Sequence, residues 1–223
     1  MPVDPVARES YRAGVRASMP FVVAVLVLGI SFGVLARSLG WGVVAPIVMS
    51  VVVMSASAQF AVASVLGAGG GAPAAILAAV LLNARFAPMG VAIASALKGG
   101  PLRRALEGQF VVDSSWAMAN RGGGRFDREF LFGATLPQTV AWVGGTAIGV
   151  FGGPFIGDPD RLGLDAIFPA FFIALLAPEL RTPRGRAAAL AAAAIALVLV
   201  PFTPPGVPVI AGTLAALIGL RRP

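Results

Sequence analysis

Long apolar runs separated by short arginine-bearing connections restrict the fold of this chain more than any other feature. The clearest runs are Phe21–Leu39, Val43–Leu66, Phe130–Phe151, Ala166–Leu180, Ala187–Val200 and Val207–Leu220. A helix of about 20 apolar residues crosses the hydrocarbon core of a bilayer, which is about 30 Å thick. Only 12% of the residues are charged, whereas a soluble domain carries about 25%. The sequence therefore predicts an all-α, polytopic integral membrane protein.

Two further segments leave the number of crossings open. Ala72–Leu97 is apolar, but Pro88 lies near its middle together with polar residues. Because proline lacks a backbone donor and clashes with the preceding turn, we expect a broken or re-entrant element here. Leu102–Asn120 has only a short apolar part, Phe110–Ala119, which is interrupted by Asp113 and two serines. This stretch is either a buried, polar-faced helix or an incomplete span. The chain is thus expected to have about 6–8 transmembrane segments.

The arginines are distributed as expected for cytoplasmic loops under the positive-inside rule. They cluster in the connections and near the ends: Arg8, Arg12, Arg16, Arg103, Arg104, Arg121, Arg125, Arg128, Arg181, Arg184, Arg186, Arg221 and Arg222. The net charge of +7 therefore indicates contact with the lipid bilayer, and without an RNA-binding motif we expect no nucleic-acid partner. We expect a multi-pass protein of the bacterial plasma or inner membrane with both termini in the cytoplasm.

The composition shifts suggest a single transmembrane permease domain over residues 1–223. We divide it into a cytoplasmic arm with an interfacial helix (1–19), N-terminal helices (20–97), a polar-faced linker (98–129) and C-terminal helices (130–222). Pro20 suits the start of the first spanning helix, because proline is favoured in the first turn. The first apolar run has no small-residue cleavage site after it, so we expect it to be retained.

The absence of cysteine and histidine excludes a disulfide, a thiolate nucleophile, an imidazole base and a His/Cys metal site. The one lysine, Lys98, lies at a segment end, and no two carboxylates share an apolar helix face. The phosphate-binding pattern G-x-x-x-x-G-K-[ST] is also absent. We therefore expect neither an enzyme nor an ATP-driven pump, and no cofactor.

Two of the spans share a short pattern in which a proline precedes a G-x-x-x-G pair. The residues are Pro20, Gly29 and Gly33 in one span, and Pro137, Gly145 and Gly149 in the other. The G-x-x-x-G spacing permits close helix contact, and many transporters are built from internal repeats. The pattern suggests an internal repeat, with chance as the alternative in a chain of 28 glycines.

Polar side chains inside the apolar segments are the candidates for a substrate site. They are Ser55, Ser57, Gln59, Asn83, Arg85, Asp113 and Ser114. Such groups are costly at membrane depth unless they face a partner or a watery cavity. The guanidinium of Arg85 can bind a substrate carboxylate through two hydrogen bonds. Asp113 can bind an ammonium group or carry a proton. The alternatives are that Arg85 and Asp113 pair with each other and that Gln59 and the serines only pack helices.

Four segments, in this order, resemble the AzlC family, the large subunits of two-component branched-chain amino acid exporters. They are FGVLARSLG (Phe32–Gly40), MSASAQF (Met54–Phe60), LLNARFAPMG (Leu81–Gly90) and VVDSSWAMA (Val111–Ala119). The resemblance implies a secondary transporter subunit that exports valine, leucine, isoleucine or methionine. It also implies that the proton motive force drives export and that a small AzlD-like membrane subunit takes part.

Two positions depart from the pattern of that family. Its members often have histidine where this chain has Phe86, and glutamate where it has Ser114. A coupling scheme that needs that histidine or that second carboxylate therefore lacks those groups at Phe86 and Ser114. The alternative function is a passive channel or a structural membrane subunit for another small solute.

Overall fold

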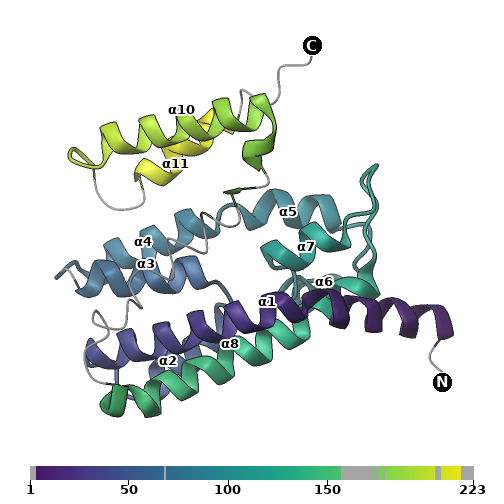
Figure 1. Ribbon diagram of the computed structural model, residues 1–223, viewed down its shortest axis with the longest axis horizontal. Coiled ribbons are helices and arrows are strands. Elements are labelled where there is room, and N and C mark those ends of the chain that lie inside the picture. The colour runs from purple at the N-terminus through teal and green to yellow at the C-terminus, as the bar shows by residue number, and fades with distance from the viewer. Residues whose placement is uncertain are drawn as a thin grey trace. The chain divides into compact units, whose positions relative to one another are not determined.

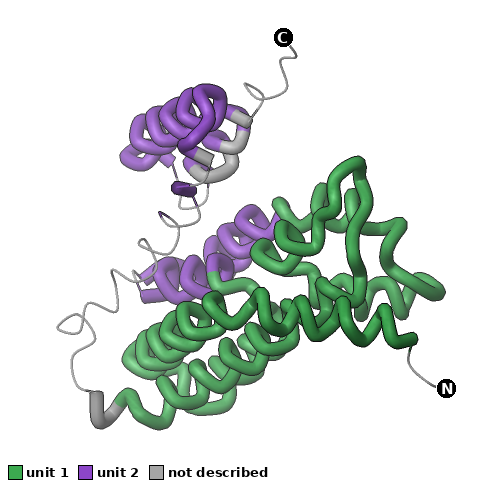
Figure 2. The backbone as a smooth tube through the Cα atoms, turned by 45° about the vertical axis from the view of Figure 1, so that its right-hand side comes forward, with its two compact units in different colours: residues 1–56, 85–157 green, residues 57–84, 158–223 purple. Residues whose placement is uncertain are grey.

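The computed structural model describes residues 4–67, 69–156, 179–203 and 207–216, together with residues 173, 176 and 177. Within these ranges the regular secondary structure is helical, with one isolated bridge between Asn120 and Phe126 (Figure 1). The all-α prediction is confirmed. The chain divides into two compact units, Met1–Ala56 with Arg85–Gly157 and Ser57–Ala84 with Asp158–Pro223 (Figure 2). We call them unit 1 and unit 2.

The scaffold of unit 1 is a pair of long helices, α1 (Pro5–Ser38) and α8 (Arg128–Ile156). Glycines allow their backbones to touch. A Cβ atom added to Gly29 would lie 2.6 Å from the carbonyl oxygen of Trp142 and 3.3 Å from the Cα atom of Gly145. Real Cβ contacts are not that short, so glycine is required where the two helices approach. The two G-x-x-x-G pairs pack against each other, whereas the internal repeat itself stays a prediction.

The contacts between α1 and α8 show that the two helices run parallel. Gly14, near the start of α1, faces Phe130 near the start of α8, and Gly33 faces Val150 farther along. Both helices therefore begin at the same end of unit 1, and α1 lies beside α8 over most of its length (Figure 1).

The prediction that the first helix begins at Pro20 is wrong, because α1 begins at Pro5 and contains Pro20 in its interior. Proline there removes one backbone hydrogen bond. The halves of α1 on either side of it are both fixed to α8, through Gly14 on one side and Gly29 on the other. This packing holds the helix continuous through the proline.

Two of the apolar runs are each formed by two helices. The second run contains α2 (Val44–Val52) and α3 (Ala56–Gly67), and the third contains α4 (Ala72–Asn83) and α5 (Phe86–Ile93). The break in the third run agrees with the expectation of a broken element. Pro88 falls in the first turn of α5, where its missing N–H costs little. By length and composition, α1 and the segment Ala72–Ile93 can cross a membrane.

The stretch Leu102–Asn120 is not one continuous polar-faced helix, and the alternative of an incomplete span stays a prediction. It contains two short helices, α6 (Pro101–Gly108) and α7 (Asp113–Ala119). The backbone of Val112 is extended, with φ −113° and ψ 156°, so the helices cannot be continuous. An apolar cluster joins α5 and α7 to α8: Ile93, Leu97, Val111, Ala119, Phe130, Leu131 and Ala134.

Unit 2 contains α3 and α4, which pack through Val65, Ala75 and Ala78. Its later part contains the short 3₁₀ helix η2 (Glu179–Arg181), α10 (Pro183–Leu199), α11 (Val207–Thr213) and the 3₁₀ helix η3 (Leu214–Ala216). The hydroxyl of Thr182 caps α10 by accepting a bond from the N–H of Gly185. The predicted span Ala166–Leu180 lies largely outside the described residues.

Candidate functional site

The central feature of the candidate site is an ion pair between Arg85 and Asp113. Arg85 donates from Nε to Oδ1 and from Nη2 to Oδ2 of Asp113, each over 3.0 Å. This fork geometry is the strongest arrangement of a guanidinium and a carboxylate. The side chains keep 34% and 44% of their exposure, respectively. The pairing considered in the sequence analysis is therefore present, and both groups remain open to solvent or a ligand.

Local structure places each member of the pair at a helix boundary. Arg85 follows the end of α4 and immediately precedes α5, where its guanidinium carbon lies 4.7 Å from the ring centre of Phe86. Asp113 is the first residue of α7 and follows the extended Val112. A carboxylate in the first turn of a helix is favoured by the positive end of the helix dipole.

Hydrogen bonds tie the start of α7 to α8. The Ser114 hydroxyl donates to Oε1 of Gln138 over 2.7 Å, and the amide nitrogen of Gln138 donates to the Ala134 carbonyl over 2.8 Å. Thr135 donates to the carbonyl oxygen of Phe110 over 2.7 Å. These contacts place the Arg85–Asp113 pair beside the Gln138 turn of α8.

Gln138 and Thr135 were not among the predicted site residues. Both are buried, with 6% and 0% exposure. The signal that could have found Gln138 is the same one that selected Gln59, namely an amide inside an apolar span. Thr135 gives no comparable signal, because a threonine hydroxyl can bond its own helix backbone.

The residues of the MSASAQF segment lie at the interruption between α2 and α3. Met54 has φ +44°, in the left-handed region that non-glycine residues rarely adopt. Ser55, Ser57 and Gln59 are buried, at 3%, 4% and 0% exposure. Asn83 is half-buried and is the last residue of α4.

The structure brings together three of the seven predicted site residues, Arg85, Asp113 and Ser114, within unit 1. Ser55 belongs to the same unit, whereas Ser57, Gln59 and Asn83 belong to unit 2. A substrate role for any of the seven stays a prediction.

A second charged cluster lies at the end of unit 1 where α1 and α8 begin. Glu107 on α6 accepts bonds from Arg128 (Nε, 3.0 Å, and Nη2), from Arg103 (3.1 Å) and from the N–H of Lys98 (3.1 Å). The bond from Arg128 is the main reason that the pKa of Glu107 is lowered to about 2, against the opposing effect of burial. Glu107 is therefore ionised at neutral pH.

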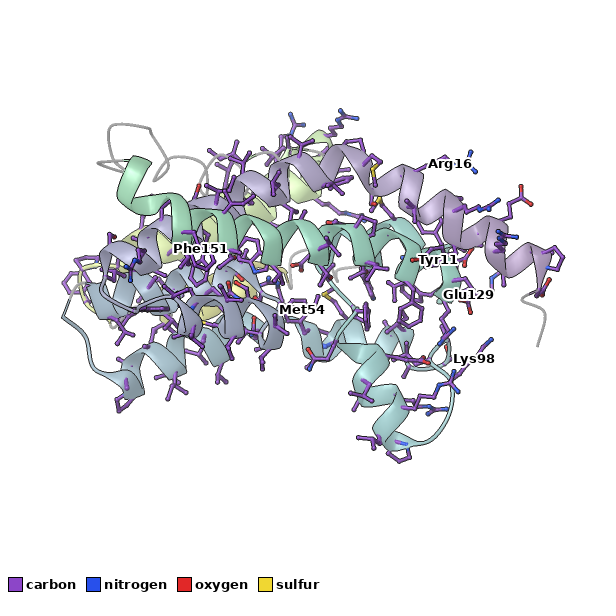
Figure 3. All side chains as sticks on the ribbon, turned by 90° about the horizontal axis from the view of Figure 1, so that it is seen from below. Tyr11, Arg16, Met54, Lys98, Glu129 and Phe151 are labelled. Atoms are coloured by element: carbon purple, nitrogen blue, oxygen red, sulfur yellow. The ribbon has the colours of Figure 1, made fainter. Side chains whose placement is uncertain are left out.

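Asp127 links the start of α8 to α1. Burial raises the pKa of this carboxyl, but bonds from the N–H of Phe130, the hydroxyl of Ser10 and the guanidinium of Arg121 outweigh burial and lower it. The Ser10 bond, at 2.7 Å, joins the first turns of α1 to the residue just before α8. Figure 3 shows Tyr11, Lys98 and Glu129 gathered at this end, away from Phe151.

The helix α5 runs towards this charged end. Its preceding residue Arg85 lies beside the Gln138 turn of α8 through Asp113 and Ser114. The residues Ile93 and Leu97 instead pack with Phe130 and its neighbours at the start of α8. Lys98 and α6 are therefore at the same end of unit 1 as the basic N-terminal part of α1.

Comparison with known proteins gives the family. The family model described as AzlC protein matches residues 20–156. The chain belongs to the AzlC family. The AzlC match spans α1 to α8 and includes every predicted site residue. Membership supports a membrane location and a transport role.

Three curated relatives agree with this assignment. An uncharacterized membrane protein of Archaeoglobus fulgidus is 33% identical over 80% of this chain and 80% of its own length. The branched-chain amino acid transport protein AzlC of Bacillus subtilis is 27% identical over 75% of this chain and 68% of its own length. The inner membrane protein YgaZ of Escherichia coli is 25% identical over 75% of this chain and 72% of its own length. No solved structure matches the chain.

Proposed function

We propose that this chain is the large subunit of a secondary transporter that exports valine, leucine, isoleucine and methionine. Family membership and the relative from Bacillus subtilis named as a branched-chain amino acid transport protein support the substrate class. We further propose that the proton motive force drives export and that a small AzlD-like membrane subunit completes the transporter. The proposed location is the bacterial plasma membrane, with the charged end of unit 1 in the cytoplasm.

The observation that carries this proposal is the half-exposed Arg85–Asp113 pair. An amino acid zwitterion carries the same two charges as this pair. Its carboxylate fits the guanidinium fork of Arg85, and its ammonium group fits the Asp113 carboxylate. In the structure each group holds the other at 3.0 Å, so a bound amino acid would replace one ion pair with two.

This exchange explains how charged groups can bind substrate without being left unpaired. A buried charge without a partner is strongly destabilising. With substrate absent, Arg85 and Asp113 neutralise each other, and their 34% and 44% exposure leaves room for the exchange. Ser114, which donates to Gln138, holds the start of α7 while Asp113 changes partners.

The test is amino acid export from cells loaded with a valine-containing dipeptide, with this chain and its small partner expressed together. Arg85→Ala should reduce valine efflux by about 30-fold or more, since truncating one member of a hydrogen-bonded charge pair costs at least about 2 kcal/mol. Collapse of the proton gradient should stop efflux. Undiminished efflux after that collapse would contradict proton coupling and favour a passive channel.

A charge-swapped double variant separates the substrate role from a structural one. Arg85→Asp combined with Asp113→Arg keeps the ion pair but exchanges the positions of the two charges. It should keep membrane abundance close to that of the unchanged protein while export stays lost. Export restored by the swap would show that the pair is purely structural. Arg121→Ala is the matched control, because Arg121 forms a comparably exposed pair with Asp127 at 3.2 Å and should export normally.

A further inference from the structure

The short helix α6 has an apolar face that no described residue covers. Leu102 and Leu106, one turn apart on this face, are 76% and 61% exposed. The adjoining face carries Arg103 and Glu107, and Glu107 is only 8% exposed. A short helix with a leucine face and a basic face is the pattern of a segment that lies in the plane of a membrane interface.

The Glu107–Arg128 bond holds α6 beside the start of α8. Arg128 is the first residue of α8 and lies two residues before Phe130, where the apolar run of that helix begins. In a span formed by α8, Arg128 would lie where the headgroup layer meets the hydrocarbon core. The Glu107–Arg128 bond would then bring the exposed leucines of α6 to the same level.

The charge around α6 is positive and largely available. The exposed basic residues at this end of unit 1 are Arg8, Arg12, Arg16, Lys98, Arg103, Arg104 and Arg125. Of the carboxylates at this end, Glu107 is bonded to Arg128 and Arg103, Asp127 to Arg121, and Glu129 to Arg128. Asp4 and Glu9 are exposed, so the exposed basic residues remain in excess. This surface is complementary to the phosphate groups of anionic lipids.

We propose that α6 is a lipid-binding helix that lies in the headgroup layer of the cytoplasmic leaflet and binds anionic phospholipids. Leu102 and Leu106 enter the upper acyl region, while Arg103, Arg104 and Lys98 bind lipid phosphates. The Glu107–Arg128 bond holds this helix to α8. The proposal depends on the membrane location of the chain and not on what the protein transports.

The first test uses the natural absence of cysteine to place single spin labels. The protein is reconstituted in nanodiscs that contain one quarter phosphatidylglycerol and three quarters phosphatidylcholine. Labels at Leu102→Cys and Leu106→Cys should be more accessible to dissolved oxygen than to a water-soluble nickel chelate. The control Arg104→Cys, on roughly the opposite face of the helix, should show the reverse.

Two results would overturn the proposal in this test. Leucine-face labels as accessible to the nickel chelate as the Arg104→Cys label would place α6 in water. Labels shielded from both reagents would show that protein, such as a second copy of this chain, covers α6.

The second test measures the requirement for anionic lipid. The affinity of the protein for spin-labelled phosphatidylglycerol, relative to phosphatidylcholine, should fall by about 5-fold for each arginine removed in Arg103→Gln and Arg104→Gln. Arg186→Gln, in unit 2, is the control and should leave this preference unchanged. An unchanged preference in the α6 variants, with normal folding shown by circular dichroism, would refute lipid binding by α6.

Discussion

Two ion pairs in unit 1 have the same chemistry and opposite surroundings. The Arg128–Glu107 pair has side chains that are 16% and 9% exposed, whereas the Arg85–Asp113 pair has 34% and 44%. Glu107 also accepts bonds from Arg103 and from the N–H of Lys98. Among the described residues, the Asp113 carboxylate accepts its bonds from Arg85.

The enclosed Arg128–Glu107 pair has the surroundings of a structural contact. The half-exposed Arg85–Asp113 pair has the surroundings of a pair whose partners can be exchanged. A carboxylate surrounded by donors is held in one position, and a ligand would have to displace several bonds to reach it. A half-exposed pair loses little when one partner is replaced by an ion of equal charge. The sequence selects Arg85 and Asp113 as polar residues of apolar segments, but it does not indicate that Glu107 and Arg128 form an enclosed pair.

The largest expected effect is on stability when Glu107 is removed. Glu107→Ala removes the carboxylate that binds Arg128 and Arg103 and leaves Arg128 paired with Glu129. It should lower the free energy of unfolding by about 3 kcal/mol, because a hydrogen bond to a charged group contributes about 1.5–3 kcal/mol. Asp113→Ala should cost about 1 kcal/mol or less, as for exposed pairs. Denaturant titration of both variants in a neutral detergent measures the difference. Equal losses would show that exposure does not separate the two pairs.

An intermediate effect is expected from acid. The pKa of Glu107 is lowered from 4.5 to about 2 in the folded protein, so the unfolded state binds a proton first as the pH falls. The stabilisation from Glu107 is therefore complete above pH 4.5 and is lost as the pH falls through about 2. The melting temperature in Glu107→Gln should decline less over this window than in the unchanged protein. Parallel declines would assign acid sensitivity to other carboxyls, with Asp127 the first to examine.

A smaller effect should follow from a change to the scaffold that positions both pairs. A methyl group at Gly149 would meet the backbone of α1 at Ile30, whereas a methyl group at Gly144 meets nothing within 4 Å. Gly149→Ala should destabilise unit 1 by about 1–3 kcal/mol through overpacking. Gly144→Ala, in the same helix, should be neutral or stabilising by up to about 1 kcal/mol, because alanine is the better helix former. Thermal unfolding of the two variants makes the comparison, and equal behaviour would contradict the tight α1–α8 contact.

Much of the fold could be predicted because bilayer chemistry restricts it. Apolar runs interrupted by arginines predict helices, and the helices α1, α8 and α10 lie where such runs occur. Helix boundaries were less predictable. Pro20 was assigned to a helix start, but tertiary packing against α8 keeps the helix intact through it. The sequence predicts one element over Leu102–Asn120, because no residue pattern marks the extended backbone at Val112.

The candidate site was predicted only in part. Arg85, Asp113 and Ser114 could be selected because charged and polar groups inside apolar segments are rare. Their grouping depends on contacts 24–28 residues apart, and no local pattern encodes these contacts. Gln138 was missed as their neighbour for the same reason.

The sequence by itself determined that this chain is an all-α membrane protein of the AzlC family type and which few polar residues lie inside its apolar segments. These properties follow from composition and local motifs, which do not require knowledge of the fold. Only the tertiary structure decided which charges pair, which of the pairs is enclosed, and that the two glycine patterns face each other in parallel helices. Burial and pairing depend on residues far apart in the chain, and the energy of a charge depends on what surrounds it.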